Sequence, residues 1–316
     1  MKSKRIACAA LALILICSIA LSACGTKSEV QDIVVTYVTS PLNVPSIVEK
    51  NHAIFAETMK SAGVNSVSYS EITSGADQTQ ALASGDIQFL YAVGATSVIL
   101  SAANGADIQI ISMYSRSPKA FCLFSMDDSI NTPEDLRGKT IAGPQGTILH
   151  ELLVAYLNQG GMTLDDVSFV NTTIPDAMSA MMGGSVDCAL LAGAAAYNTQ
   201  AGGAHLVTNG DGLVEASICC AATKEFCDAN PELVESFLKA QEEVLGFMAE
   251  NEETALAEAA EFLDLDIAAV RDMYAYYDFD MTIRDSDIAA MQSTVQFMLD
   301  SGMIEENVDI SSIVRR

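Results

Sequence analysis

The pattern of apolar and polar positions is most informative in residues 81–95, which read ALASGDIQFLYAVGA. An apolar helix end, a Gly-Asp turn, a short apolar strand and a loop of small residues follow one another there. Residues 180–194, AMMGGSVDCALLAGA, repeat this order, with a strand predicted over 186–191. Two copies predict two similar α/β lobes. Ligands of open α/β sheets bind at the carboxyl edge, so we expect the loops around Gly94 and Gly193 to face each other across a cleft.

The same pattern continues along the chain as short apolar runs alternating with helical periodicity. The apolar runs predict strands over residues 33–38, 67–72, 108–113, 120–124, 140–142, 167–170, 205–208 and 217–222. The helical spacing predicts helices over residues 44–59, from 73 toward 84, and over 95–103, 147–158 and 175–182. Two more are predicted toward the end of the chain, one capped by Asn230 and one ending at Gly302. The order strand, helix, strand indicates parallel βαβ units.

The pattern changes near residues 115–118, where the chain leaves the first lobe. We assign residues 32–118 plus 221–316 to the first lobe and residues 119–220 to the second. A length of 316 residues fits two domains of about 100–200 residues each. Two crossing segments between the lobes form a hinge, which permits closure around a ligand.

The first residues carry a targeting signal. Basic residues at positions 2, 4 and 5 precede an apolar run over 6–20 and the sequence Leu-Ser-Ala-Cys. This pattern predicts a secretory signal peptide over residues 1–23. The sequence around Cys24 resembles the bacterial lipobox, which implies a lipid on Cys24 and a polar tether over 24–31. The alternative is an uncleaved membrane anchor, because the run approaches the roughly 18 apolar residues that a span needs.

The charge restricts the partners. The chain is 50% apolar and has a formal net charge of −25. Cleavage before Cys24 removes three of its 16 basic residues and no acid, which makes the charge −28. Such acidity argues against nucleic acid or anionic lipid as a partner.

Five cysteines remain after the leader and Cys24 are set aside: Cys122, Cys188, Cys219, Cys220 and Cys227. Their odd number, without a CxxC pair, is a poor disulfide framework and a poor zinc site. We expect buried thiols, the alternative being a bridge from Cys227 to Cys219 or Cys220.

The catalytic motifs that the sequence suggests are each incomplete or absent. His150 and Glu151 begin an HExxH motif, but position 154 is Val. Residues 138–140 imitate the end of a P-loop, but position 133 is Pro where Gly is required. Neither GxSxG nor GxGxxG occurs. The sequence therefore predicts a protein that is not an enzyme and has no metal and no cofactor.

The candidate ligand contacts are backbone groups at helix starts. Gly146, Thr147 and Ile148 follow a predicted strand, and Ser74 with Gly75 opens another helix. Free N–H groups and the positive end of the helix dipole make such starts anion sites. The alternative is that they are ordinary N-caps. In the two strand-end loops, the candidates are Gly94 with Ala95 and Gly193 with Ala194.

Four side chains are further candidates. Arg116 lies just before the crossover and could grip a carboxylate or sulfonate with two hydrogen bonds. The alternative is a salt bridge with one of the many acids. Ser40 and Asn43 could add hydrogen bonds, and Tyr91 an aromatic wall; Tyr91 could equally belong to the core.

Several segments together resemble a known family. They are Ser84-Gly85-Asp86-Ile87, Ser117-Pro118-Lys119, Asp135-Leu136-Arg137-Gly138-Lys139, Gly146-Thr147-Ile148-Leu149-His150 and Gly183-Gly184-Ser185-Val186-Asp187. The chain resembles the solute-binding proteins of ABC importers in the nitrate, sulfonate and taurine group, which shares its fold with thiamine-pyrimidine-precursor binders. The resemblance implies the α/β type II periplasmic-binding-protein fold, with two Rossmann-like lobes joined by a two-segment hinge.

The resemblance also implies a function. A monomer, anchored outside the cytoplasm by its lipid, would capture a small anionic organic solute and deliver it to an ABC permease in the membrane. Sulfonate binders often carry Trp-Asp-Pro where this chain has Ala192-Gly193-Ala194, and Thr-Gly-Asp where it has Ala92-Val93-Gly94. The alternatives are a binder of a thiamine-pyrimidine precursor or another small organic compound, a related pyrimidine-synthesising enzyme, or the ectodomain of a sensor.

Overall fold

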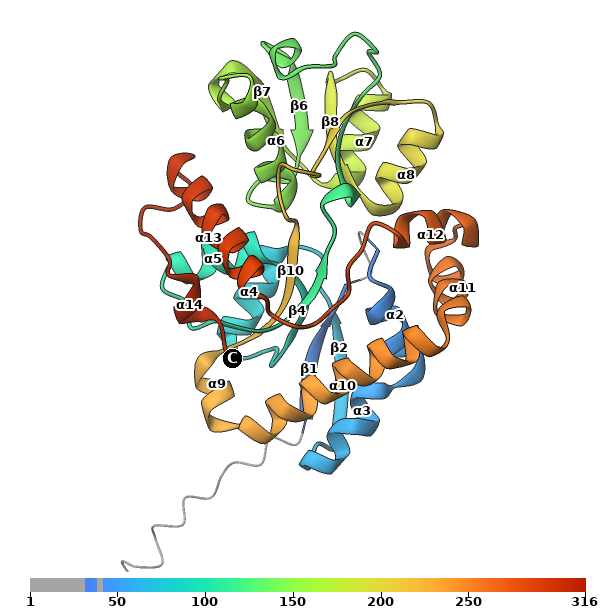
Figure 1. The fold of residues 1–316 in the computed structure, drawn as a ribbon, viewed down its shortest axis with the longest axis vertical. Coiled ribbons are helices and arrows are strands. Elements are labelled where there is room, and N and C mark those ends of the chain that lie inside the picture. The colour runs from blue at the N-terminus through green and yellow to red at the C-terminus, as the bar shows by residue number, and fades with distance from the viewer. Residues whose placement is uncertain (1–31, 39–41) are drawn as a thin grey trace, which may run out of the picture. The chain divides into compact units, whose positions relative to one another are not determined.

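The computed structural model describes residues 32–38 and 42–316 (Figure 1). The predicted signal peptide, Cys24, the tether and Ser40 lie outside these residues. The described strands form a two-stranded sheet, β1 (Asp32–Tyr37) and β2 (Ser66–Glu71), and a three-stranded sheet in the order β3 (Leu90–Gly94), β10 (Ser217–Ala222), β4 (Gln109–Arg116). A five-stranded sheet has the order β7 (Ser168–Asn171), β6 (Thr140–Gly143), β8 (Cys188–Ala192), β5 (Phe121–Ser125), β9 (His205–Asn209).

The strand pairings agree with the predicted βαβ units. Strands β1 and β2 are parallel, as are β6 with β7 and β6 with β8. Strand β10 runs antiparallel to both β3 and β4, so it returns between them. A parallel bridge between Val35 and Phe89 links the first two sheets. We call the elements around these two sheets the first lobe, and those around the five-stranded sheet the second lobe.

The helices of the first lobe are α2 (Val44–His52), α3 (Ile54–Met59), α4 (Gly75–Ser84), α5 (Ala95–Ala103), α9 (Lys224–Ala229), α10 (Pro231–Glu250), α11 (Glu252–Leu263), α12 (Ile267–Tyr274), α13 (Asp285–Asp300) and α14 (Ile310–Ile313). Those of the second lobe are α6 (Ile148–Gln159), α7 (Ile174–Met182) and α8 (Gly193–Ala201). The orange α10 and α11 lie against the blue α2 and α3 in Figure 1, so residues 231–263 pack onto residues 44–59.

The single helix predicted over residues 44–59 is wrong, because the helix breaks at Ala53. This residue has a left-handed φ of 52° and separates α2 from α3. The break is held by Glu49, whose carboxylate accepts hydrogen bonds from the Phe55 N–H (3.1 Å) and the Tyr69 hydroxyl (2.6 Å). A buried acid thus opens the helix, although the apolar spacing continues across it.

Two smaller predictions also need correction. The strand predicted over residues 186–191 begins later, at Cys188, because the Asp187 carboxylate accepts a hydrogen bond from the Thr140 N–H (2.7 Å) and holds a turn there. Asn230 precedes α10, but its side chain does not cap that helix: its amide donates to the Phe226 carbonyl at the end of α9 (3.0 Å).

Aromatic side chains fill the centre of the first lobe. The Phe89 and Phe237 rings stack with centroids 4.3 Å apart, and Phe55 and Tyr91 close the cluster with centroids 5.0 Å apart. Smaller residues form the core of the second lobe, where Phe124 packs among alanine, cysteine and methionine side chains. The five cysteines of the described chain are buried free thiols, so the alternative of a bridge to Cys227 is not formed.

The two segments that cross between the lobes are tied together at Gly210. Its N–H donates to the carbonyls of Pro118 (3.1 Å) and Phe121 (3.0 Å). A Cβ at this position would lie 2.5 Å from the Pro118 oxygen, so only glycine permits this approach. No helix among residues 32–38 and 42–316 is long and apolar enough to cross a membrane.

Candidate functional site

Helix starts from the two lobes meet where β3 and β6 end. Gly94 precedes α5 in the first lobe, and a Cβ placed on it would lie 3.7 Å from Cδ1 of Ile148, the first residue of α6. Gly146 has a φ of +73°, and its Cβ would lie 3.9 Å from Cδ2 of Leu100. The structure therefore brings Gly94, Gly146 and Ile148 together at the junction of the lobes.

Glu151 crosses this junction from the first turn of α6. It is 9% exposed, and its carboxylate accepts hydrogen bonds from the Thr96 hydroxyl of α5 (3.1 Å) and the Thr294 hydroxyl of α13 (2.7 Å). Burial raises the pKa of Glu151, and the two hydroxyl donors act in the opposite direction. One acid of the second lobe is thus bonded to two helices of the first.

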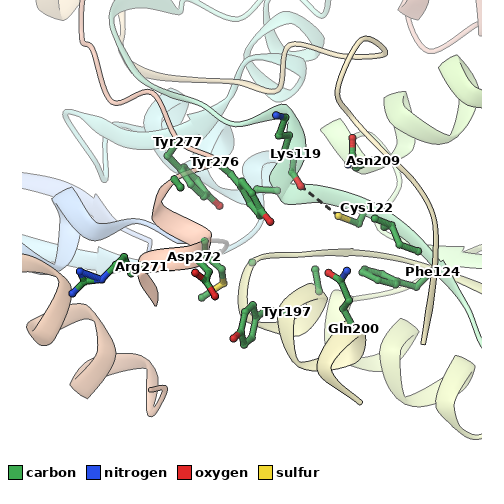
Figure 2. Close-up of a pocket in the computed structure, with 16 residues that line it drawn as sticks. Lys119, Cys122, Phe124, Tyr197, Gln200, Asn209, Arg271, Asp272, Tyr276 and Tyr277 are labelled. Atoms are coloured by element: carbon green, nitrogen blue, oxygen red, sulfur yellow. Dashed lines mark hydrogen bonds between the residues drawn. The ribbon is translucent and has the colours of Figure 1, made fainter. Parts of the chain in front are cut away.

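A pocket of about 560 Å³ lies beside the start of α8 (Figure 2). Among the described site candidates, Gly193 alone lines it. Figure 2 shows Tyr276 on one side of the pocket and Tyr197 with Gln200 on the other. Its remaining lining residues come from the hinge, β5, β9 and the end of α12, and include Lys119, Phe124, Asn209, Arg271, Asp272, Met273 and Tyr277.

The cations at this pocket already have acidic partners. Arg271 donates to both carboxylate oxygens of Glu253, at 3.1 and 2.8 Å. The Lys119 ammonium lies 3.6 Å from the Asp211 carboxylate. An anionic ligand would have to compete with these acids, whereas the N–H groups at the start of α8 are fixed by the backbone.

Arg116 is bonded inside the protein. Its guanidinium is 8% exposed and donates to both carboxylate oxygens of Asp287, at 2.5 and 2.6 Å. It also donates to the carbonyls of Asp280 and Thr282, at 2.8 Å each. Ligand contact, as predicted, would require Arg116 to leave these partners, so the salt-bridge alternative describes its place in the structure.

The other candidates of the first lobe lie apart from the pocket. Ser74 is exposed and caps α4 by accepting from the Asp77 N–H (3.4 Å). A Cβ on Gly75 would lie 2.2 Å from Oγ of Ser97, so Gly75 packs against the start of α5. Asn43 is buried and donates to the Val38 carbonyl (2.9 Å).

Tyr91 and Thr147 are held by their own surroundings. Tyr91 is 1% exposed within the aromatic core, with its ring centroid 4.8 Å from that of Tyr114, so it forms no wall of the pocket. Thr147 occupies the N-cap position of α6, but its hydroxyl donates to the Pro144 carbonyl (2.8 Å). Ala95 and Ala194 are the first residue of α5 and the second of α8.

Apart from Gly193, the residues that line the pocket were not among the predicted contacts, nor was Glu151. In the sequence, Glu151 stands out only as part of the incomplete HExxH motif. Tyr276 and Tyr277 follow the last turn of α12, and the three tyrosines within residues 274–277 were the available signal.

Burial shifts the pKa of His150, Cys122 and Cys188 in the second lobe. Burial lowers the pKa of His150, whose ring stacks on Phe169 with centroids 4.9 Å apart. Burial also raises the pKa of Cys122 and of Cys188 to about 12, which keeps both thiols protonated at neutral pH. Within the described ranges, no group of three or more His, Cys, Asp and Glu side chains is placed to hold a metal ion.

Comparison with known proteins adds to this geometry. The family model described as NMT1/THI5 like matches residues 47–255. The chain belongs to the NMT1/THI5-like family. It is 28% identical over 224 residues to the taurine-binding periplasmic protein of Escherichia coli (strain K12). The aligned residues cover 70% of this chain and 67% of that protein. This confirms the predicted resemblance to the sulfonate and taurine group of solute-binding proteins.

Solved structures of the family's fold agree with the arrangement of the lobes. The alkanesulfonate-binding protein SsuA from Xanthomonas axonopodis pv. citri, bound to MOPS, is similar with a TM-score of 0.82 at 21% identity, over 92% of this chain and 99% of that one. The predicted type II periplasmic-binding-protein fold is confirmed. The desulfurization enzyme DSZB is similar with a TM-score of 0.65 at 16% identity, over 90% of this chain and 96% of that one. The fold therefore accommodates an enzyme as well as binding proteins.

Proposed function

We propose that this protein is the extracytoplasmic solute-binding component of an ABC importer and captures a small anionic organic solute of the sulfonate or taurine type. The observation that carries the proposal is a pocket lined from both lobes, with Gly193 at the start of α8 on one side and Tyr276 after α12 on the other. N–H groups at helix starts and the positive end of the helix dipole favour an anion. Similarity to the taurine-binding periplasmic protein of Escherichia coli supports this ligand class.

The pocket beside Gly193 would receive the organic part of the solute. Its volume of about 560 Å³ falls in the usual range for small-molecule sites, about 300–1,000 Å³. Phe124, Met273 and the tyrosines supply apolar surface, and Gln200 and Asn209 supply polar groups. A single solute that contacts α8 and the end of α12 would touch both lobes.

Closure follows from differential affinity. A solute that touches both lobes binds the closed arrangement better than the open one, and shifts the population by that difference. We propose residues 32–118 with 217–316 and residues 119–216 as the two moving bodies, turning about the segments joined at Gly210. The boundary expected after residue 220 moves to before residue 217, because β10 pairs with β3 and β4 of the first lobe. A lipid on Cys24 would keep the monomer beside its permease.

A second function has one observation in its favour. Three tyrosines, Tyr197, Tyr276 and Tyr277, line the pocket, and flat rings of this kind can stack on a planar heterocycle. A thiamine-pyrimidine precursor is therefore the alternative solute. An enzyme is a weaker alternative, because the pocket's one cysteine, Cys122, has a raised pKa.

A thermal-stability screen tests the proposal. Taurine, alkanesulfonates, nitrate, carboxylates of matched length and a hydroxymethylpyrimidine are each added to the purified protein. A solute at 100 times its Kd stabilises the folded state by about 2.7 kcal/mol, which raises Tm by roughly 5 °C for a chain of this size. A rise with sulfonates supports the proposal. A rise with the pyrimidine alone supports the alternative, and a screen in which no sulfonate or taurine changes Tm contradicts the proposal.

A further inference from the structure

The bridge made by Glu151 is the one place where a buried acid of the second lobe is bonded directly to two described helices of the first. Its carboxylate accepts from Thr96 of α5 at 3.1 Å and from Thr294 of α13 at 2.7 Å. Thr96 is 1% exposed and Glu151 9% exposed. Both hydrogen bonds run between lobes, so they exist only while α6 lies against α5 and α13.

Among the described residues, the groove beside Glu151 is lined by acids and by no lysine or arginine. Glu151 lines this groove of about 660 Å³ between α6 and α13, together with apolar Val154 and Phe297. The charged groups of that groove are acids, Asp165 from the turn before β7 and Asp300 from α13, and its lining includes no lysine or arginine. The preceding residue, His150, has its pKa lowered by burial and is neutral at neutral pH. A carboxylate buried without a cation is unfavourable unless hydrogen bonds or a proton compensate.

We propose that Glu151 is a positioning residue that sets solute affinity by latching the two lobes together through Thr96 and Thr294, without contacting the solute. This inference rests on the proposed function, because it assigns the latch to the closed arrangement that a solute would select. The apparent Kd of a solute rises in proportion as the closed fraction falls, so a lost latch weakens binding at a distance.

The latch is sensitive to pH. Burial raises the pKa of Glu151 above its ordinary 4.5 in the closed arrangement, and opening exposes the carboxyl and restores the ordinary value. In the closed arrangement, Glu151 therefore stays protonated to a higher pH than in the open one. Closure is favoured most below pH 4.5 and weakens as the pH rises through the raised pKa.

Three substitutions separate the roles of the carboxyl. Glu151→Gln keeps both bonds, since its amide oxygen accepts from one threonine and its N–H donates to the other, and it removes the charge. Glu151→Ala removes both bonds. Asp165→Asn is the matched control, because Asp165 lines the same groove and is not bonded to Thr96 or Thr294 in the structure.

The experiment measures lobe closure without a solute. Small-angle scattering is recorded at pH 5 and pH 8 on the full chain carrying Cys24→Ser to prevent lipidation. The latch predicts that the parent protein is more compact at pH 5 than at pH 8, that Glu151→Gln is compact at both, and that Glu151→Ala is extended at both. Asp165→Asn should follow the parent. Superimposable curves for parent, Glu151→Gln and Glu151→Ala would overturn the proposal.

Titration with taurine then separates the latch from the function. If taurine binds, Glu151→Ala should raise its Kd by about tenfold or more, while Glu151→Gln at pH 8 should bind at least as tightly as the parent. If scattering depends on Glu151 but taurine and the alkanesulfonates do not bind, the latch stands and the proposed function fails. If taurine binds Glu151→Ala as tightly as the parent, the function stands and the latch fails.

Discussion

The place of Arg116 can be tested by replacing it with a residue of similar length and no charge. Arg116→Met leaves the Asp287 carboxylate, 4% exposed, with the Arg284 N–H at 2.6 Å as its remaining backbone donor. Removing one partner of a buried ion pair costs about 3–5 kcal/mol. Two further bonds, to the carbonyls of Asp280 and Thr282, are lost with it. We expect the free energy of unfolding to fall by about 4 kcal/mol.

Urea unfolding followed by circular dichroism measures this loss. Arg284→Met is the matched control, because Arg284 pairs with Asp278 and Asp280 while 42% exposed, and exposed ion pairs contribute little to stability. Solute affinity of the folded Arg116→Met protein should change by less than about threefold, since its role is to hold the segment before α13. Unchanged stability together with a loss of affinity of tenfold or more would refute this reasoning and restore Arg116 as a ligand contact.

Three further predictions concern stability and attachment. Burial raises the pKa of Glu49 to about 7, so its stabilising contribution is complete below pH 4.5 and is lost as the pH rises through 7. Glu49→Gln should therefore flatten the pH dependence of the free energy of unfolding, measured in urea. An unchanged pH dependence would count against a protonated Glu49. Gly210→Ala should lower Tm, since its Cβ would lie 2.5 Å from the Pro118 carbonyl oxygen. Gly246→Ala, in open space on α10, should raise Tm. Equal changes in Tm would contradict the close approach of Gly210 to Pro118. Cys24→Ser should move the protein from the membrane fraction to the soluble fraction, and retention in the membrane would indicate an uncleaved span.

The predictable parts of the fold are those encoded by neighbouring residues. The helix over residues 95–103 and the strand over 217–222 match the predicted bounds, because an unbroken apolar pattern and clear turn residues delimit them. The break at Ala53 escaped prediction, because it depends on Glu49 being buried and bonded to Tyr69, which lies 20 residues away. Apolar spacing alone does not reveal such a partner.

The candidate site depends even more on partners that are distant in the sequence. Glycines at strand ends marked the lobe junction, because a bare backbone is a local property of the sequence. The partners of Glu151 lie 55 and 143 residues away, and Asp287 lies 171 residues from Arg116. Pairing at such separations follows from how the chain packs, so the sequence leaves the choice between a ligand contact and a salt bridge open for Arg116.

Calorimetric titration of the purified protein with the alkanesulfonate that raises Tm most is the most direct test of solute capture between two lobes. We predict one solute per chain, saturable binding and a negative heat-capacity change, because closure removes apolar surface from water. Binding without saturation, or conversion of the solute into a product during the titration, would contradict it.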